Sequence, residues 1–363
     1  MASGFFSRFT RGTPQERLGI DIGTTSVKIV EARRGTKGPE VVNYGLLEAG
    51  DYLGRANSAL QTSALQLFER ETVDLLRLTL KKMNTRATRA VFSIPIFSYF
   101  YTVIDLPQMT ESEIGKNIEH QARQYVPFPS AELFVEWIRM DEYEDARGVM
   151  HTPVFFMAIP KEQVQKYRAI ADALGLDLRS LEMESMSTVR SLVGNDASPA
   201  LIVDIGSRST AIAFARKGKI AFAAQSDFAG ASLTQAIASS LNINPRRAEE
   251  LKCEKGIAGS GADYELSTLM MPFLDVIMNE VKKARGAYER QFPFSSKLER
   301  VILTGGGANL KGLESYVKRE LDLPVGIAAP FSRYAYKPEL ELVVRELNPR
   351  FSVALGLALQ ELH

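Results

Sequence analysis

The sequence predicts an α/β protein that contains two copies of one unit, with an α+β module inserted in the first copy. The stretch from Asp21 to Gly35 matches the stretch from Asp204 to Gly218 at eight of fifteen positions. The two stretches lie about half a chain length apart in 363 residues, which indicates an internal duplication. Residues 89–180 follow a strand and helix pattern that has no counterpart in the second half. These observations together predict a duplicated fold with one insertion.

The overall composition is that of an ordinary globular protein. Hydrophobic residues make up 45% and charged residues 24%, and the formal net charge is +1. Because this charge is close to zero, composition gives no reason to expect a nucleic-acid partner. The single cysteine, Cys253, excludes an internal disulfide framework. No apolar run reaches the length of about 18 residues that a membrane span needs, and residues 1–16 are expected to form a flexible tail.

Alternating apolar residues between short turns predict the strands of the first copy, and apolar residues at helical spacing predict its helix. We expect these elements in the order of strands at 17–23, 26–35 and 41–50, a helix at 64–84, and a strand at 89–95 that ends at Pro95.

The insertion is predicted to contain strands, two helices and an acidic loop. Thr110 and Glu113 have the spacing of a capping box, so a helix is expected to begin after Thr110 and to end before Pro127. The other expected elements are strands at 99–107, 132–140 and 152–160, a solvated loop at 141–148, and a helix at 161–176 that ends near Gly175.

The second copy repeats the opening strands and continues with more helix. A final amphipathic helix is expected over 349–362. Before it, the expected elements are strands at 200–206, 210–218 and 220–225, a helix at 233–241, a mainly helical stretch at 245–290, and a strand, glycine turn and helix over 300–321.

Both copies place an aspartate, a glycine turn and hydroxyl side chains at the end of a strand. Glycine lets the backbone turn tightly and direct its N–H groups at phosphate oxygens. A carboxylate at the strand end suits the water molecules of a magnesium ion. Two such sets facing each other would hold a polyphosphate from both sides. The residues are Asp21, Gly23, Thr24, Thr25 and Ser26 in the first copy, and Asp204, Gly206, Ser207 and Thr210 in the second.

A third glycine cluster lies between a strand and a helix in the second copy. Gly305, Gly306 and Gly307 have no side chains, so this backbone is able to lie flat against a planar ring or a sugar. Asn309 is expected to cap the helix that follows, and a helix N-terminus favours anions. A single glycine cluster of this kind is most often an ordinary turn, but three clusters in one chain favour nucleotide binding.

In order and spacing, the three clusters resemble the phosphate-1, phosphate-2 and adenosine motifs of the actin-like ATPase superfamily, which has a duplicated ribonuclease H-like fold. Within it the chain is most similar to the PilM family of type IV pilus assembly, in the FtsA/PilM branch, from about residue 17 to 362. The most discriminating stretch is QARQYVPFPSAELFVEW in the insertion. The resemblance implies a first actin-like subdomain at 17–88, completed by 181–199 and 345–362, an inserted subdomain at 89–180, and a second half at 200–344 with a helical part at about 245–295.

The resemblance also implies residue roles. Gly23, Thr24, Thr25 and Ser26 would line the β- and γ-phosphates of ATP with Lys28 nearby, and Asp21 and Asp204 would hold Mg2+ through water. Gly206, Ser207 and Thr210 would contact the other phosphate face, where Arg208 is bulkier than usual. Gly230 would approach the ribose, Glu280 and Lys283 would bracket the adenosine, and Gly305, Gly306, Gly307 and Asn309 would form the adenine floor. Without these neighbouring motifs, an ordinary i,i+3 surface pair would be the favoured interpretation of Glu280 and Lys283.

The expected function is ATP binding with weak or absent hydrolysis, with no catalytic residue assigned. Glu182 and Glu184, near the crossing between the copies, fit no catalytic pattern. The family resemblance implies a cytoplasmic adaptor, peripheral to the inner membrane through its partner, that binds the N-terminal tail of a PilN-like membrane protein. The candidate docking surface is the stretch 93–107 with YVPFP at 125–129. The alternatives are an FtsA-like polymerising scaffold and a small-molecule kinase.

Overall fold

A computed structural model describes this chain in two compact units. Contacts group residues 1–34 and 43–184 in unit 1, and residues 35–42 and 185–361 in unit 2. The expected tail, except Glu16, and Pro127 lie outside the described residues. Those residues are 16–36, 38–48, 65–126, 129–145, 147–257, 262–292 and 297–360.

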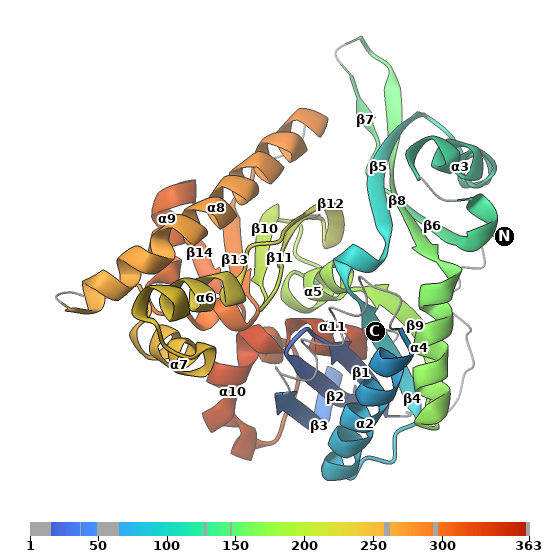
Figure 1. Ribbon diagram of the computed structural model, residues 1–363. Helices are drawn as coiled ribbons and strands as arrows, with labels where there is room; N and C mark the ends of the chain where they lie inside the picture. Colours follow the sequence, from blue (N-terminus) through green and yellow to red (C-terminus); the bar gives the residue numbers. More distant parts are fainter. Residues whose placement is uncertain are drawn as a thin grey trace. The chain divides into compact units, whose positions relative to one another are not determined.

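The first sheet has five strands in the order β3-β2-β1-β4-β9 (Figure 1). Strand β1 pairs antiparallel with β2 and parallel with β4, and β4 pairs parallel with β9. The antiparallel register places Asp21 directly opposite Lys28. The strands are β1 (Arg17–Ile22), β2 (Ser26–Gly35), β3 (Gly38–Glu48), β4 (Arg89–Ile94) and β9 (Asp177–Met183).

Two helices of unit 1 pack against each other, and one of them contacts a strand of this sheet. Helix α2 (Leu65–Met83) packs against α4 (Lys161–Ala173), and α4 also contacts β9. On α4 the buried ring of Tyr167 meets Phe92 of β4 edge to face, with ring centroids 6.1 Å apart. The end of the expected helix is correct, since Gly175 follows α4 with a positive φ of 67°.

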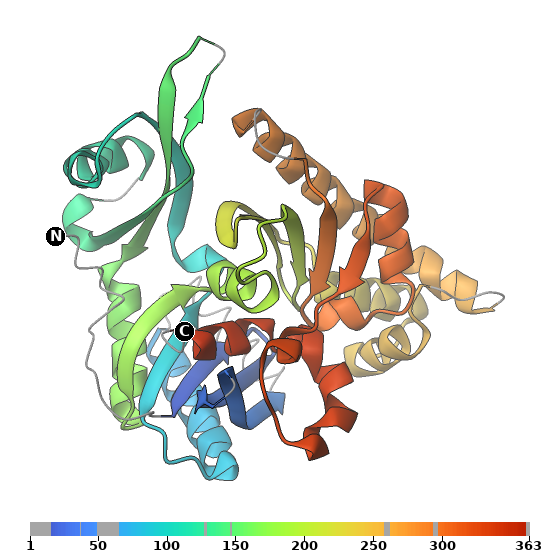
Figure 2. The same ribbon diagram turned by 180° about the vertical axis from the view of Figure 1, so that it is seen from behind.

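The inserted module has its own sheet, in the order β5-β8-β6, with the short strand β7 also paired to β8. Helix α3 packs on this sheet (Figure 2), and the predicted capping box is confirmed because Thr110 and Glu113 bond each other reciprocally. The core includes Ile104, Ile118 and Phe156. The elements are η1 (Ile96–Ser98), β5 (Phe100–Pro107), α3 (Glu111–Tyr125), η2 (Ser130–Glu132), β6 (Leu133–Arg139), β7 (Tyr143–Glu144) and β8 (Met150–Pro160).

This module is shorter than the expected range of 89–180. Strands β4 and β9 lie in the first sheet, where parallel pairing joins them, and α4 packs with that sheet. The expected acidic loop forms the tip of the β7–β8 hairpin, where Arg147 and Gly148 are exposed to solvent as predicted. In it Tyr143 stacks on His151 with ring centroids 4.9 Å apart, and Asp145 accepts backbone hydrogen bonds from Arg147 and Val149.

The second sheet repeats the topology of the first, with the order β12-β11-β10-β13-β14. The antiparallel pair β10–β11 corresponds to β1–β2, and the parallel pair β10–β13 corresponds to β1–β4. The duplication predicted from the sequence is therefore confirmed in three dimensions. The strands are β10 (Ala200–Ile205), β11 (Thr210–Arg216), β12 (Lys219–Ser226), β13 (Arg300–Thr304) and β14 (Val325–Ile327).

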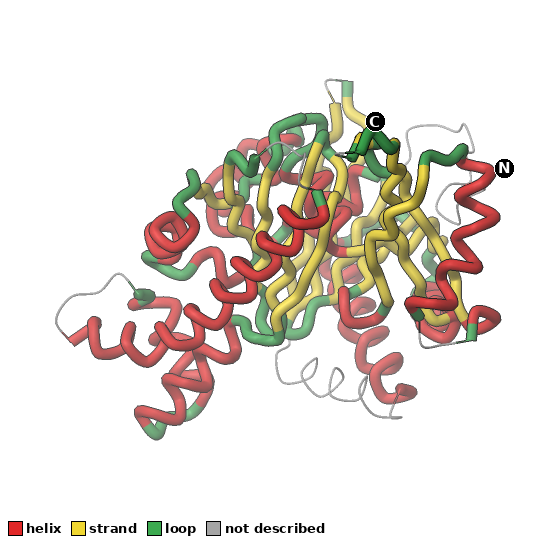
Figure 3. Tube along the Cα trace, turned by 90° about the horizontal axis from the view of Figure 1, so that it is seen from above, coloured by secondary structure: helices red, strands yellow, loops and turns green. Residues whose placement is uncertain are grey.

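Helices flank the strands, as the view from above shows (Figure 3). The long helix α8 contacts β11 and β12 of the second sheet, and α6 packs between α7 and α8. In the described part of the chain, no helix is long and apolar enough to span a bilayer. The helices are α5 (Glu184–Leu192), α6 (Gly230–Leu241), α7 (Pro245–Lys255), α8 (Ala262–Gln291), η3 (Gly306–Asn309), α9 (Leu313–Leu321), η4 (Pro330–Arg333), η5 (Pro338–Leu340), α10 (Glu341–Leu347), η6 (Asn348–Arg350) and α11 (Ser352–Leu359).

The last helix differs from the expected amphipathic one. Every residue from Ser352 to Leu359 is buried, so α11 has no solvent face. A Cβ at Gly356 would lie 1.9 Å from the carbonyl oxygen of Ser187 on α5, which shows how closely the two helices pack. Helices apolar on all sides are typical of core positions.

Candidate functional site

Asp21 lies at the end of β1, where side chains from three adjacent strands converge. It is 4% exposed. From β2 the ammonium of Lys28 lies 3.0 Å from Oδ2 of Asp21, and from β4 the hydroxyl of Ser93 donates to Oδ1 at 3.0 Å. Both carboxylate oxygens therefore have a donor. Ser93 was not among the residues predicted from the sequence, where its only signal is its place near the end of the neighbouring strand.

The turn after Asp21 is a tight hairpin loop. The N–H of Gly23 donates to the carbonyl of Ser26 at 2.9 Å, which leaves Thr24 and Thr25 at the tip. A Cβ at Gly23 would lie 3.0 Å from that carbonyl oxygen and 3.4 Å from Nζ of Lys28. Glycine therefore permits both the tight turn and the close approach of the ammonium.

The second copy forms the same turn. The N–H of Gly206 donates to the carbonyl of Ser209 at 3.0 Å, with Ser207 and Arg208 at the tip. Ser209 is thus the counterpart of Ser26, and the identity of the two serines in the aligned repeats was the signal that could have found it. Thr210 corresponds to Val27 in the register and is fully buried, and its hydroxyl donates to the carbonyl of Phe228 at 2.8 Å.

The N-terminus of α6 rests on this second turn. The N–H of Gly230 donates to the carbonyl of Gly206 at 3.1 Å, and the N–H of Ala231 donates to Ser207 at 2.7 Å. A Cβ at Gly230 would lie 3.2 Å from the carbonyl oxygen of Gly206. Glycine therefore lets the positive end of the α6 dipole approach the turn, where the first two N–H groups of α6 bond carbonyl oxygens of the turn.

A buried ammonium on α7 fixes the start of α6. Nζ of Lys252 donates to the carbonyl of Gly230 at 3.1 Å, to the hydroxyl of Thr234 at 3.0 Å and to Glu249 at 2.6 Å. Lys252 is 8% exposed. Burial alone would raise the pKa of Glu249, but the charge and hydrogen bond of Lys252, together with hydrogen bonds from Thr234 and Cys253, lower that pKa overall. This pair was not predicted from the sequence, although Glu249 and Lys252 have the same Glu-x-x-Lys spacing as Glu280 and Lys283.

The pair expected to bracket an adenosine has a different setting. On α8, Nζ of Lys283 donates to Glu280 at 2.6 Å, and the side chain of Lys283 is 71% exposed. This is the geometry of the surface-pair alternative. The structure brings Glu249 and Lys252, rather than Glu280 and Lys283, to the turn at Gly230.

The glycine loop after β13 lies against the end of β10. Gly305 has a φ of 81°, and a Cβ there would lie 2.3 Å from Oδ1 of Asp204. A Cβ at Gly307 would lie 2.4 Å from Cγ2 of Ile205, whereas nothing lies within 4 Å of a Cβ at Gly306. Two of the three glycines are therefore required by close packing, and the third faces open space.

Asn309 does not cap the helix after this loop, so that prediction was wrong. Gly312 is the N-cap residue of α9, and Asn309 ends the short 3-10 helix η3 instead. The side-chain amide of Asn309 lies 3.5 Å from the carbonyl of Glu346. The residues that the sequence pattern assigned to the start of the helix form a 3-10 turn instead.

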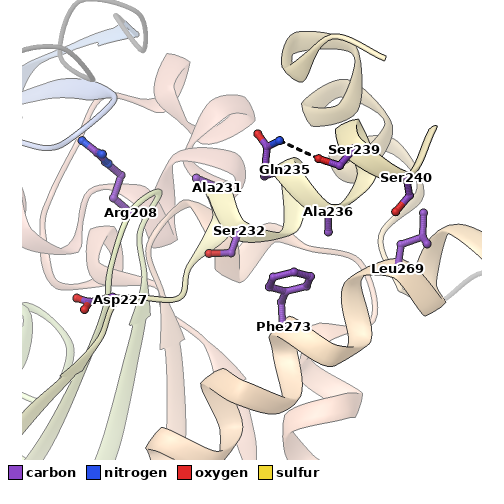
Figure 4. A pocket seen from close by; sticks show the side chains of 10 residues that line it. All are labelled: Arg208, Asp227, Ala231, Ser232, Gln235, Ala236, Ser239, Ser240, Leu269 and Phe273. Carbon is purple, nitrogen blue, oxygen red and sulfur yellow. Dashed lines mark hydrogen bonds between the residues drawn. The ribbon is translucent and has the colours of Figure 1, made fainter. Parts of the chain in front are cut away.

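Beside the second turn, an open hollow lies between α6 and α8 (Figure 4). Phe273 of α8 lies below the polar side chains of α6, and Arg208 and Asp227 stand at one end. Of the expected site residues only Arg208 lines this hollow. Its lining residues are Arg208, Asp227, Ala231, Ser232, Gln235, Ala236, Ser239, Ser240, Leu269 and Phe273.

The structure thus collects the expected residues in two groups. Unit 1 holds Asp21, its turn and Lys28, and unit 2 holds Asp204, the second turn, Gly230 and the glycine loop. Among the described residues no group of three or more His, Cys, Asp or Glu side chains could hold a metal ion by itself. Glycine turns with adjacent carboxylates and ammonium groups suit a phosphate ligand.

Comparisons with known proteins identify the family and the fold. Residues 19–362 match the sequence model of a family described as type IV pilus assembly protein PilM. A solved PilM-PilN type IV pilus biogenesis complex is similar in structure, with a TM-score of 0.77 and 22% identity, covering 96% of this chain and 99% of that one. The structure of MreB5 of Spiroplasma citri bound to ADP is similar with a TM-score of 0.55 and 14% identity, covering 96% of both chains. These likenesses confirm the actin-like ATPase fold.

Cell division proteins FtsA are similar in sequence. That of Pseudomonas aeruginosa is 26% identical over 208 residues, which is 50% of this chain and 47% of that protein. That of Neisseria meningitidis is 23% identical over 288 residues, which is 69% of this chain and 66% of that protein. The chain therefore spans about half and about two thirds of the length of these relatives.

Proposed function

Because this chain belongs to the PilM family of type IV pilus assembly proteins, we propose that it is an ATP-binding adaptor of pilus assembly. In this proposal it binds the cytoplasmic N-terminal tail of a PilN-like inner-membrane protein, and the nucleotide tunes that interaction. The adaptor would lie on the cytoplasmic side and reach the membrane through this partner. The similar solved structure is described as a PilM-PilN complex, which supports a partner of this kind.

The observation that carries ATP binding is the repeated turn. Gly23 and Gly206 close hairpin loops of the same length after an aspartate, with hydrogen bonds of 2.9 and 3.0 Å. The first residues of α6 donate hydrogen bonds to the second loop. The glycine loop from Gly305 to Gly307 lies against the end of β10, from which the second loop begins. Backbone N–H groups and a helix N-terminus are the phosphate-binding devices of many nucleotide sites.

The carboxylates fit a hydrated magnesium ion. Magnesium keeps several water molecules and needs only one or two carboxylates plus substrate phosphates. Gly305 leaves room for the side chain of Asp204, since any Cβ there would touch its Oδ1. Asp21 and Asp204 are therefore the residues that would hold the ion through water, and the ion would neutralise phosphate charge.

The contacts of Gly230 change which residues we propose to bind the nucleoside. Glu249 and Lys252 join Gly230 as the candidate ribose and adenosine residues, while Glu280 and Lys283 stay candidates to be tested beside them. The loop of Gly305, Gly306 and Gly307 remains the proposed adenine floor, with Asn309 at its end.

Hydrolysis is proposed to be weak or absent. Hydrolysis needs a group that orients the attacking water. Glu182 is 4% exposed within β9, and Glu184 is the first residue of α5. Burial makes Glu182 a poor general base, and Glu184 has the ordinary stabilising position of a carboxylate in the first turn of a helix. We therefore assign no catalytic residue.

The proposed partner surface lies where the module joins the first sheet. Phe97, in the 3-10 turn before β5, is 49% exposed. Next to it Tyr99 is 7% exposed with a hydroxyl that has no hydrogen-bond partner, and its ring lies 5.8 Å from that of Tyr101. An exposed aromatic side chain two residues before the buried ring of Tyr99 suits contact with an anchor side chain of a bound peptide.

The test is a titration calorimetry experiment with ATP, Mg2+ and a peptide from the N-terminal tail of a PilN-like protein. We expect ATP to bind the chain alone and to change the affinity for the peptide. Absence of ATP binding in the unaltered chain would overturn the nucleotide part, and absence of peptide binding in every nucleotide state would overturn the adaptor part.

A polymerising scaffold is the second candidate because FtsA proteins are among the relatives by sequence. Sedimentation with ATP and Mg2+ separates the two functions. An adaptor stays in the supernatant at the concentration at which it binds the peptide, whereas a scaffold forms pelleted filaments.

A further inference from the structure

The segment from Ser93 to Tyr99 joins the proposed nucleotide site to the proposed partner surface. At its start, the hydroxyl of Ser93 on β4 donates to Oδ1 of Asp21 at 3.0 Å. Phe97, which is 49% exposed, lies in the turn η1, and Tyr99 follows that turn as its C-cap residue. Because only residues 94–96 separate Ser93 from Phe97, a shift at one end of this segment has a short path to the other.

Tyr99 stands between the first sheet and the sheet of the inserted module. Before it, β4 pairs in parallel with β1 and β9, and after it β5 pairs antiparallel with β8. The ring of Tyr99 lies 5.8 Å from that of Tyr101 on β5, and the ring of Tyr101 stacks on Phe155 of β8 at 6.2 Å. A displacement of Tyr99 therefore acts directly on the aromatic side chains of the module's sheet.

The hydroxyl of Tyr99 is a buried donor without a partner. Tyr99 is 7% exposed, and no atom of the described residues accepts a hydrogen bond from its hydroxyl. Buried hydroxyl groups are normally hydrogen-bonded, because an unmade bond leaves the loss of hydration uncompensated. An unsatisfied group of this kind stores strain that a second conformation is able to release.

The charged group that acts on this hydroxyl is Glu184, the first residue of α5. Burial raises the pKa of Tyr99, and the negative charge of Glu184 raises it further. Burial also raises the pKa of Tyr167 on α4, and the charges of Glu184 and Asp21 add to that shift. Glu184 therefore supplies a carboxylate acceptor within electrostatic reach of the unpaired hydroxyl.

We propose that Tyr99 couples nucleotide binding to partner binding, a role that rests on the proposed function. Tyr99 is a positioning residue with two arrangements: its hydroxyl is unpaired in one and donates to the carboxylate of Glu184 in the other. Occupation of the turn after Asp21 favours the second arrangement through Ser93, and the movement of Tyr99 displaces Phe97 at the partner surface. Each ligand thereby changes the affinity for the other through a hydroxyl that is buried from both.

The experiment measures a coupling factor, the ratio of the dissociation constants of the PilN-like peptide without and with saturating ATP and Mg2+. Titration calorimetry supplies both constants for the unaltered chain, Tyr99→Phe, Glu184→Ala and Tyr288→Phe. Coupling between two sites typically changes an affinity by about 5–150-fold, and we expect a change of this size in the unaltered chain. Tyr99→Phe and Glu184→Ala are each expected to bring the factor to within about twofold of one, whatever the affinity of each ligand alone.

Tyr288→Phe is the matched control. Tyr288 on α8 is 1% exposed, and its hydroxyl also has no hydrogen-bond partner in the described part of the chain. It belongs to unit 2, where its ring stacks on Phe214 with centroids 4.6 Å apart. This variant therefore removes a buried, unpaired hydroxyl away from the segment from Ser93 to Tyr99, and its coupling factor is expected to equal that of the unaltered chain.

The outcomes separate this inference from the proposed function. An unchanged factor in Tyr99→Phe, or an equal loss in Tyr288→Phe, overturns the coupling role while the proposed function stands, and a retained factor in Glu184→Ala overturns the assigned acceptor. If the unaltered chain binds both ligands with a factor of one, the nucleotide tuning in the proposed function fails together with this inference. If it does not bind ATP or the peptide, the corresponding part of the proposed function fails first. Thermal unfolding establishes that each variant is folded before its factor is compared.

Discussion

The ammonium of Lys252 donates a hydrogen bond to the carbonyl oxygen of Gly230 at 3.1 Å, so a buried side chain on α7 fixes the first residue of α6. That residue in turn donates to the carbonyl of Gly206, which belongs to the second glycine turn. One ammonium thereby links the helical part of unit 2 to the loop proposed to bind phosphate. The link makes the helix N-terminus a fixed part of the candidate site.

This link predicts that Lys252→Met weakens ATP binding by roughly tenfold or more, because a hydrogen bond to a charged group contributes about 1.5–3 kcal/mol. The matched control is Lys283→Met, which removes an exposed ammonium bonded to Glu280 on α8. Calorimetry on both variants decides which Glu-x-x-Lys pair serves the nucleoside. If Lys283→Met weakens ATP binding and Lys252→Met does not, the result would support Glu280 and Lys283, the pair predicted from the sequence.

The glycine loop offers a comparison between adjacent positions. Gly305→Ala is expected to lower the free energy of unfolding by about 1–3 kcal/mol or more, because a side chain at this positive φ is strained and its Cβ would collide with Asp204. Gly306→Ala is expected to leave stability within about 0.5 kcal/mol of the unaltered chain, since nothing lies near its Cβ. Urea unfolding measures both.

At the same open position, Gly306→Glu is expected to abolish ATP binding and to weaken capture of the PilN-like peptide while the chain still folds. The added carboxylate would occupy the space proposed for the nucleotide and repel its phosphates. Gly306→Ala is the control for the loss of glycine itself. Retained ATP affinity in a folded Gly306→Glu protein would place the nucleotide elsewhere.

The exposed aromatic at the base of the module predicts a partner contact. Phe97→Ser is expected to weaken binding of the PilN-like peptide by about 2 kcal/mol or more, the loss typical of an aromatic anchor. Leu78→Ser on α2 is the control, because Leu78 has a similar exposure of 43% but lies away from that turn in the sequence. Fluorescence anisotropy with a labelled peptide measures both, and equal small effects would show that Phe97 is no anchor.

The start of unit 2 contains an acid-sensitive contact. Backbone and side-chain hydrogen bonds from Ser198, together with the guanidinium of Arg300 at 2.6 Å, lower the pKa of Asp196 to about 2. Because the folded pKa lies below the unfolded value, this contact stabilises the fold above about pH 4 and is lost as the pH falls toward 2. Asp196→Asn is therefore expected to flatten the decline of stability between pH 4 and 2, as followed by urea unfolding. An unchanged decline would contradict the assignment.

Local patterns determined much of this fold. The duplicated turn follows from residues that are adjacent in the sequence, since Gly23 and Gly206 each bond a serine three residues later. The capping box of Thr110 and Glu113 is equally local. Such features depend on short-range backbone geometry, which is why the repeated sequence identified both turns and the parent fold.

Contacts between distant segments were decided only by the tertiary structure. Lys252 reaches Gly230 from another helix, Ser93 reaches Asp21 from a neighbouring parallel strand, and α11 loses its solvent face by packing around Gly356. Each of these depends on which elements become neighbours, and side-chain spacing along one element does not report that. The sequence alone therefore determined the duplicated glycine turns and their chemistry. The tertiary structure decided which charged side chain faces each turn, because that choice is made by strand register and helix packing.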